Sequence, residues 1–70
     1  MTAVKWAPNG GRLNSYRASI GHIEWVLELK RVGWVLVNLS YRMHDVFVAS
    51  VSADTSIAQS RAITKARNVA

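Results

Sequence analysis

The sequence contains no cysteine and only four acidic residues, and each shortage excludes a class of protein. Without cysteine, neither disulfide bonds nor thiolate–metal sites can stabilise the fold. A chain of 70 residues forms a single domain, residues 1–70, and buries only a modest fraction of its surface. Stability must come from an efficient apolar core or from self-association, and the composition leaves a monomer and a homodimer equally open.

The shortage of acids leaves the chain strongly basic. Nine Lys and Arg against four Asp and Glu give a net charge of +5, which favours polyanions or acidic protein surfaces as partners. Half of the residues are apolar and three are tryptophan, which argues against intrinsic disorder. The N-terminal segment has no apolar core of signal-peptide length, so we expect a cytoplasmic protein.

The sequence also lacks an uninterrupted apolar run. Charged residues interrupt its most apolar stretch, IEWVLELKRVGWVLVNL at 23–39: Glu24, Glu28, Lys30 and Arg31. A membrane-spanning helix needs about 20 predominantly apolar residues, and charges are costly at the bilayer centre. Apolar and polar side chains instead alternate, as in a half-buried strand. We therefore expect no membrane association and predict an antiparallel hairpin over residues 22–42.

Two further segments have strand character. Residues 13–20 alternate so that Tyr16, Ala18 and Ile20 face the core. Residues 46–52 carry apolar side chains on both sides, and we expect this strand to be covered on both faces.

The N-terminal segment contains the turn-forming sequence PNGG at 8–11. Val4 and Trp6 precede this turn. They form a short edge strand, or Trp6 packs against the core, and the sequence leaves both alternatives open.

The C-terminal segment predicts a helix over residues 55–69. Asp54, Thr55 or Ser56 can cap it, and Gln59 lies three residues after Ser56, as a capping box requires. Small apolar residues at helical spacing form one stripe: Ala58, Ala62, Ile63, Ala66 and Val69 or Ala70. Such a stripe allows the helix to lie close to a sheet.

These elements predict an α+β fold, in which a three- to four-stranded antiparallel β-meander carries one C-terminal α-helix packed on one face. The other face of the sheet would expose Glu24, Glu28 and Lys30 together with apolar residues such as Val26. An open face that is incompletely polar is a candidate contact surface.

Residues that support catalysis or metal binding are scarce. His22 and His44 are the only histidines, and their nearest acids are Glu24 and Asp45, so a two-histidine and carboxylate site is conceivable. No Walker loop, glycine-rich dinucleotide motif or zinc pattern occurs. A domain of this size also has little room for a ligand pocket of the usual ~300 Å³ or more. We predict no enzymatic activity, no cofactor and no metal.

The basic residues form two groups that can serve as a binding surface. The first lies on the predicted strands or at their ends: Arg17, Lys30, Arg31 and Arg42. The second lies on the predicted helix: Arg61, Lys65 and Arg67. Such residues bind phosphates or acidic side chains, or they are ordinary solvated charges that keep an apolar small protein in solution.

The layout resembles that of many small phage-encoded accessory proteins. In these, strands lead into a Ser/Thr-capped helix with interleaved Ala and Lys/Arg. The residues that fit this arrangement here are Ser56, Ala58, Ala62, Lys65 and Ala66. The resemblance covers residues 22–70 and concerns architecture, so no functional residue is carried over. The strand-plus-helix order is also similar to double-stranded-RNA-binding domains, although those begin with a helix.

The resemblance implies a non-enzymatic viral binding protein. We expect it to modulate or inhibit a host protein or defence complex in the host cytoplasm, through its basic and partly apolar surface. One alternative is a regulatory protein that binds DNA or RNA directly with the same basic residues. Another is a structural protein that self-associates through its apolar sheet face.

Overall fold

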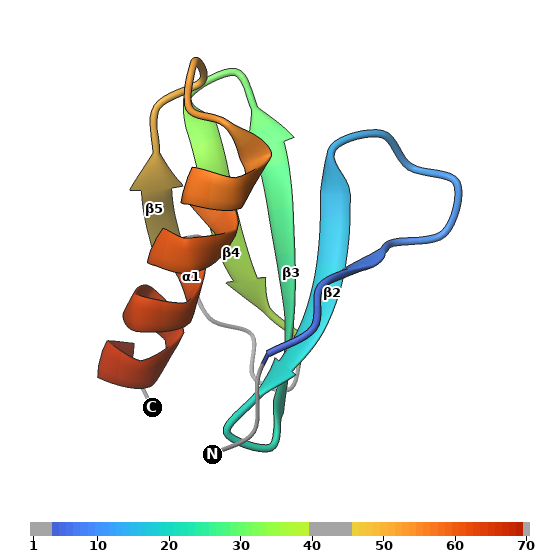
Figure 1. The fold of residues 1–70 in the computed structure, drawn as a ribbon, viewed down its shortest axis with the longest axis vertical. Coiled ribbons are helices and arrows are strands. Elements are labelled where there is room, and N and C mark those ends of the chain that lie inside the picture. The colour runs from blue at the N-terminus through green and yellow to red at the C-terminus, as the bar shows by residue number, and fades with distance from the viewer. Residues whose placement is uncertain (1–3, 40–45, 70) are drawn as a thin grey trace.

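The computed structural model describes residues 4–39 and 46–69. Within them, the chain forms a five-stranded sheet and one helix: β1 (Ala7–Pro8), β2 (Ser15–Ile20), β3 (Ile23–Lys30), β4 (Gly33–Asn38), β5 (Val46–Ala49) and α1 (Thr55–Val69). Neighbouring strands are antiparallel and follow chain order, and α1 lies on one face of the sheet (Figure 1). The predicted α+β class is confirmed, but the sheet has five strands rather than three to four.

Short turns join the central strands. Gly21 and His22 connect β2 to β3, and both have positive φ, 61° and 67°, as a two-residue type I′ turn requires. Arg31 and Val32 connect β3 to β4. The predicted hairpin is confirmed over the two strands β3 and β4, and its last residues, 40–42, lie outside the described residues.

The core lies between the sheet and α1. Its buried residues come from four strands and the helix: Ala18, Ile20, Trp25, Leu27, Trp34, Leu36, Val48, Ala49, Ala58, Ala62 and Ala66. The predicted inward orientation of residues 16, 18 and 20 is confirmed. The Trp34 Nε1–H donates to the Ala53 carbonyl at 3.1 Å and joins β4 to the segment before α1.

The predicted helix over residues 55–69 is confirmed, including the alanine part of its apolar stripe. The side chain of Val69, and Ala70, lie outside the described residues. Asp54 directly precedes α1 and occupies the N-cap position. Ser56 and Gln59 both lie inside the helix, so the predicted capping box is wrong, because that motif requires the serine at the N-cap.

Two strand predictions need correction. β5 ends at Ala49 instead of residue 52, and the Phe47 side chain is 53% exposed. The expected burial of this strand on both faces is wrong, because α1 covers only one face of the sheet. At the N-terminus, the edge strand consists of Ala7 and Pro8, while Val4 and Trp6 pack against the core.

The most apolar stretch of the sequence, residues 23–39, forms β3 and β4 with the turn between them. In the part of the chain that the structure describes, no helix has the length and apolar character needed to cross a membrane.

Candidate interaction surface

The face of the sheet that points away from α1 carries both polar and apolar side chains. Cα partners in an antiparallel sheet share a face, so the register groups these side chains: Ser15, Arg17, Ser19, Glu24, Val26, Glu28, Lys30, Val35, Val37 and Phe47. The charged members come from β2 and β3, and the apolar members are concentrated on β4 and β5. The predicted mixture of charged and apolar side chains on this face is confirmed. The expected exposure of Val26 is wrong: it is only 5% exposed, because it lies on the central strand between its cross-strand partners Arg17 and Val37.

Arg17 is ion-paired with an acid on the neighbouring strand. Its guanidinium lies 3.5 Å from a Glu24 carboxylate oxygen, and the Ser19 hydroxyl donates to the same carboxylate at 2.6 Å. The two charged side chains are about half exposed, 48% and 46%, so the pair stabilises the fold by at most about 1 kcal/mol. Its main effect is to balance the Arg17 charge locally.

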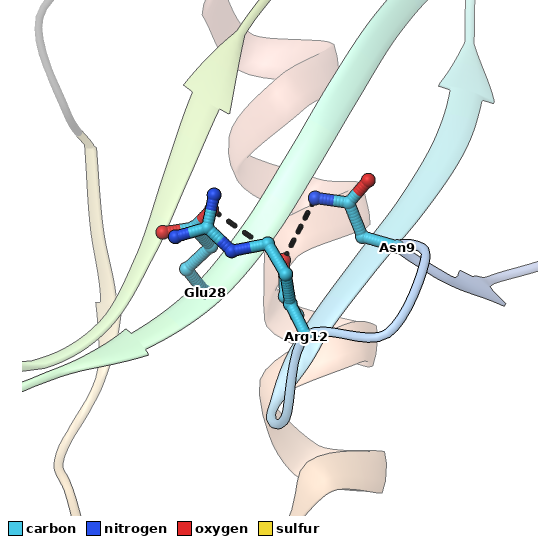
Figure 2. Close-up of polar contacts among 4 residues, drawn as sticks. Asn9, Arg12 and Glu28 are labelled. Carbon is cyan, nitrogen blue, oxygen red and sulfur yellow. Dashed lines mark hydrogen bonds and ion pairs between the residues drawn. The ribbon is translucent and has the colours of Figure 1, made fainter.

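A second polar network attaches the β1–β2 loop to β3. The Asn9 amide donates to the Ser15 hydroxyl at 3.0 Å, and that hydroxyl donates to the Glu28 carboxylate at 3.4 Å. Figure 2 shows the Arg12 side chain extending to the same carboxylate, at 4.0 Å. The charge of Arg12 is therefore also placed beside an acid, although Arg12 is largely exposed.

Helix α1 has a different charge pattern. It carries Arg61, Lys65 and Arg67 and no acidic residue. All three side chains are exposed, because the buried alanine stripe faces the sheet. At 3.6 residues per turn, Arg61 and Lys65 follow one side of the helix and Arg67 lies on the other. Within the described part of the chain, the pairs Arg12–Glu28 and Arg17–Glu24 link sheet or loop residues, and neither involves α1.

Apart from Leu39, which follows β4, the large exposed aliphatic side chains of the described residues lie at one end of the molecule. In a meander, alternate connections lie at the same end, and Figure 1 places the β1–β2 loop, the β3–β4 turn, the β5–α1 loop and the start of α1 there. We call this region the loop end. Its exposed apolar residues are Leu13, Val32, Val51 and Ile57. Arg31 shares the turn with Val32, so the loop end combines aliphatic contact area with positive charge.

The structure separates the seven basic residues predicted as a binding surface. Arg17 and Lys30 lie on the open sheet face, and Arg31 lies at the loop end. Three lie on α1, on the opposite side of the sheet: Arg61, Lys65 and Arg67. Arg42 lies outside the described residues. The predicted set therefore does not form one continuous patch.

The pairing of Arg17 with Glu24 was not predicted from the sequence. The signal for it is the two-residue turn Gly21–His22, which sets Ser19 opposite Glu24 and leaves Arg17 on the adjacent diagonal. Once this turn is placed, a cross-strand ion pair follows.

Residues with metal-ligand chemistry do not gather within the described residues, where no group of three or more His, Cys, Asp or Glu side chains could hold an ion. His22 is exposed in the β2–β3 turn. His44 and Asp45 lie outside the described residues.

Comparisons with protein-family models, with curated proteins and with solved structures found no match to this chain. Its function is therefore inferred from the geometry and charge of the molecule.

Proposed function

We propose that this chain is a non-enzymatic binding protein that docks onto an acidic protein surface through α1. The observation that supports this is the contrast between the helix and the sheet. Arg61, Lys65 and Arg67 are exposed on an element without acids, whereas Arg12 and Arg17 lie beside glutamates. Cations that are not balanced locally steer an acidic partner toward the surface that carries them.

An acidic protein fits this surface better than a nucleic acid does. Proteins that bind single strands stack bases on exposed aromatic side chains. Among the described residues, the large exposed aromatic side chain is Phe47, which lies on the sheet face opposite α1. The exposed side chain near the start of α1 is the aliphatic Ile57, at 44% exposure, which suits contact with another protein.

The proposed target is a host protein or defence complex, and binding would inhibit it by covering one of its interfaces. The motivation for a host target is the architectural resemblance of residues 22–70 to small phage-encoded accessory proteins. A cytoplasmic encounter is compatible with a chain that contains no cysteine.

The test compares two variants of equal net charge. In the helix variant, Arg61, Lys65 and Arg67 are changed to Gln. In the control variant, Arg12, Arg17 and Arg31 are changed to Gln; both changes lower the net charge from +5 to +2. Fluorescence anisotropy with labelled poly-glutamate, duplex DNA and single-stranded DNA measures binding at about 50 and 200 mM salt, over which electrostatic binding to nucleic acid weakens strongly.

We expect the helix variant to bind poly-glutamate about tenfold more weakly than the unmodified protein. The control variant should lose less than about threefold, because two of its three arginines, Arg12 and Arg17, lie beside glutamates. An equal loss of poly-glutamate affinity in both variants would show that binding responds to net charge alone, and it would contradict docking through α1. Tighter and salt-steep binding to DNA would favour the nucleic-acid alternative. With the helix dependence established, affinity capture with both variants would identify the target.

A further inference from the structure

The two edges of the sheet differ in their ability to accept another strand. Edge strand β1 has two residues, Ala7 and Pro8. Ala7 pairs with Arg17, and the Asn9 N–H donates to the Ser15 carbonyl at 2.9 Å, so the residues on either side of Pro8 face β2. Pro8 therefore faces outward, and it has no N–H to offer. A proline in this position blocks strand addition at the β1 edge.

The other edge strand, β5, contains neither proline nor a charged residue. Backbone hydrogen-bonding groups alternate in direction along a strand, so residues i and i+2 face the same neighbour. The Leu39 N–H donates to the Glu24 carbonyl at 3.0 Å, so the odd-numbered residues from 33 to 39 face β3. Leu36 consequently faces β5, where it pairs with Val46. Phe47, the next residue, directs its N–H and C=O away from β4, to the outer edge.

The side chain of Phe47 is also available for contact. It is 53% exposed and lies on the open face, where its ring passes close to Gly33. The next two residues, Val48 and Ala49, are only 4% and 1% exposed, and a register shift places both near Trp34. An outward backbone donor, an outward acceptor and a half-exposed ring therefore coincide at Phe47.

We propose that β5 pairs antiparallel with β5 of a second copy of this chain, across a two-fold axis at Phe47. Each Phe47 N–H would donate to the Phe47 carbonyl of the other copy, and the two rings would meet across the strands on the open face. A residue on a two-fold axis pairs with itself, so the contact is self-complementary and the assembly closes as a dimer. With no charged side chain in β5, the paired strands carry no like charges to repel each other.

The dimer extends the proposed function without depending on it. A two-fold axis perpendicular to the sheet keeps both copies of α1 on the same face of one continuous sheet. Because α1 lies over the β4–β5 side (Figure 1), the two basic helices would lie on either side of the axis. The resulting surface would present two sets of Arg61, Lys65 and Arg67, and a partner with two acidic patches would bind it bivalently.

Sedimentation velocity of the purified protein, without any target, tests the dimer. A short edge-to-edge contact belongs to the weak, transient class of interfaces, so we expect the mass to rise from 7.8 kDa toward twice that value between about 5 and 200 µM. Dimerisation should strengthen in 500 mM salt, because salt screens repulsion between the basic copies. A mass that stays at 7.8 kDa over this range, at low and high salt, would overturn the proposal.

Variants at Phe47 test whether the dimer forms through the outer edge of β5. Phe47→Pro removes the outward N–H and the aromatic ring but no hydrogen bond within the sheet, so we expect a folded monomer by circular dichroism and sedimentation. Phe47→Val keeps this N–H and should still dimerise, with a dissociation constant raised less than about tenfold, since a smaller apolar side chain loses contact area. If the proline variant does not fold, Phe47→Lys replaces it as the test. We expect this variant to be monomeric, because two lysines across the axis repel each other at an exposed position.

Dimerisation of either the proline or the lysine variant with the affinity of the unmodified protein would refute pairing through β5. The variant with Gln at positions 61, 65 and 67 should still dimerise, and somewhat more tightly. Its loss of poly-glutamate binding is a separate result, so the failure of one proposal can be told from the failure of the other.

Discussion

At the scale of single residues, Gly33 is the glycine that least tolerates a side chain. It begins β4 with a φ of 129°, a conformation that residues with a Cβ rarely adopt. A Cβ atom there would lie 2.4 Å from the Ala49 carbonyl oxygen and 2.9 Å from Phe47 Cε1. The oxygen belongs to the neighbouring strand and cannot move without disturbing the β4–β5 pairing. Sheet geometry therefore requires glycine at this position.

We predict that Gly33→Ala lowers the free energy of unfolding by about 2–4 kcal/mol, since backbone strain and a steric clash act together. Urea denaturation followed by tryptophan fluorescence measures the change. Gly21→Ala is the control for strain alone, because its φ is 61° with nothing within 4 Å, and it should cost about 1–2 kcal/mol. Gly11→Ala, with neither strain nor a near neighbour, should be close to neutral. Equal effects at residues 33 and 21 would show that β5 shifts to accept the methyl group.

At the scale of elements, close approach of α1 to the sheet explains the alanine stripe. Ala58, Ala62 and Ala66 are 0%, 0% and 1% exposed, and they are the buried residues that the helix contributes to the core. The large apolar side chains of the core come from the strands, among them Trp25 and Trp34. The helix backbone therefore lies close to the sheet at these three alanines, while the partly buried Ile63 is the longer helix side chain that packs against the core.

We predict that Ala62→Leu lowers the free energy of unfolding by about 1–3 kcal/mol, because the added methylene groups have no space between helix and sheet. Thr64→Leu introduces the same side chain on the exposed side of α1 and should change stability by less than about 0.5 kcal/mol. Urea unfolding of both variants gives the comparison. If Ala62→Leu were as stable as Thr64→Leu, the close packing of α1 would be contradicted.

At the scale of the whole molecule, positive charge is distributed unevenly between the two layers. Arg12 and Arg17 lie beside Glu28 and Glu24, so much of the charge on this side of the sheet is balanced. The helix layer has no acid among its own residues. Mutual repulsion within α1 therefore opposes folding, while the same charges favour an acidic partner.

We predict opposite effects of salt on stability and on binding. Raising salt from about 20 to 500 mM should increase the free energy of unfolding by up to about 1 kcal/mol, because it screens repulsion among the α1 cations. The same change should weaken binding to poly-glutamate. The variant with Gln at positions 61, 65 and 67 should show a smaller salt effect on stability. Unfolding at both salt concentrations tests this, and a stability that falls with salt would contradict it.

Local patterns in the sequence determined the α+β class, the limits of α1 and the inward side chains of β2, because helical and strand periodicities reflect the geometry of each element alone.

The tertiary structure decided the features that depend on strand register and on which face of the sheet the helix covers. Strand pairing added β1 to the sheet and placed Arg17 beside Glu24. The helix covered one side only, which left Phe47 exposed and separated the basic residues into two layers. These features depend on residues far apart in the chain, and no local pattern records which of them meet. The host target, the absence of enzymatic activity and the absence of a cofactor stay predictions.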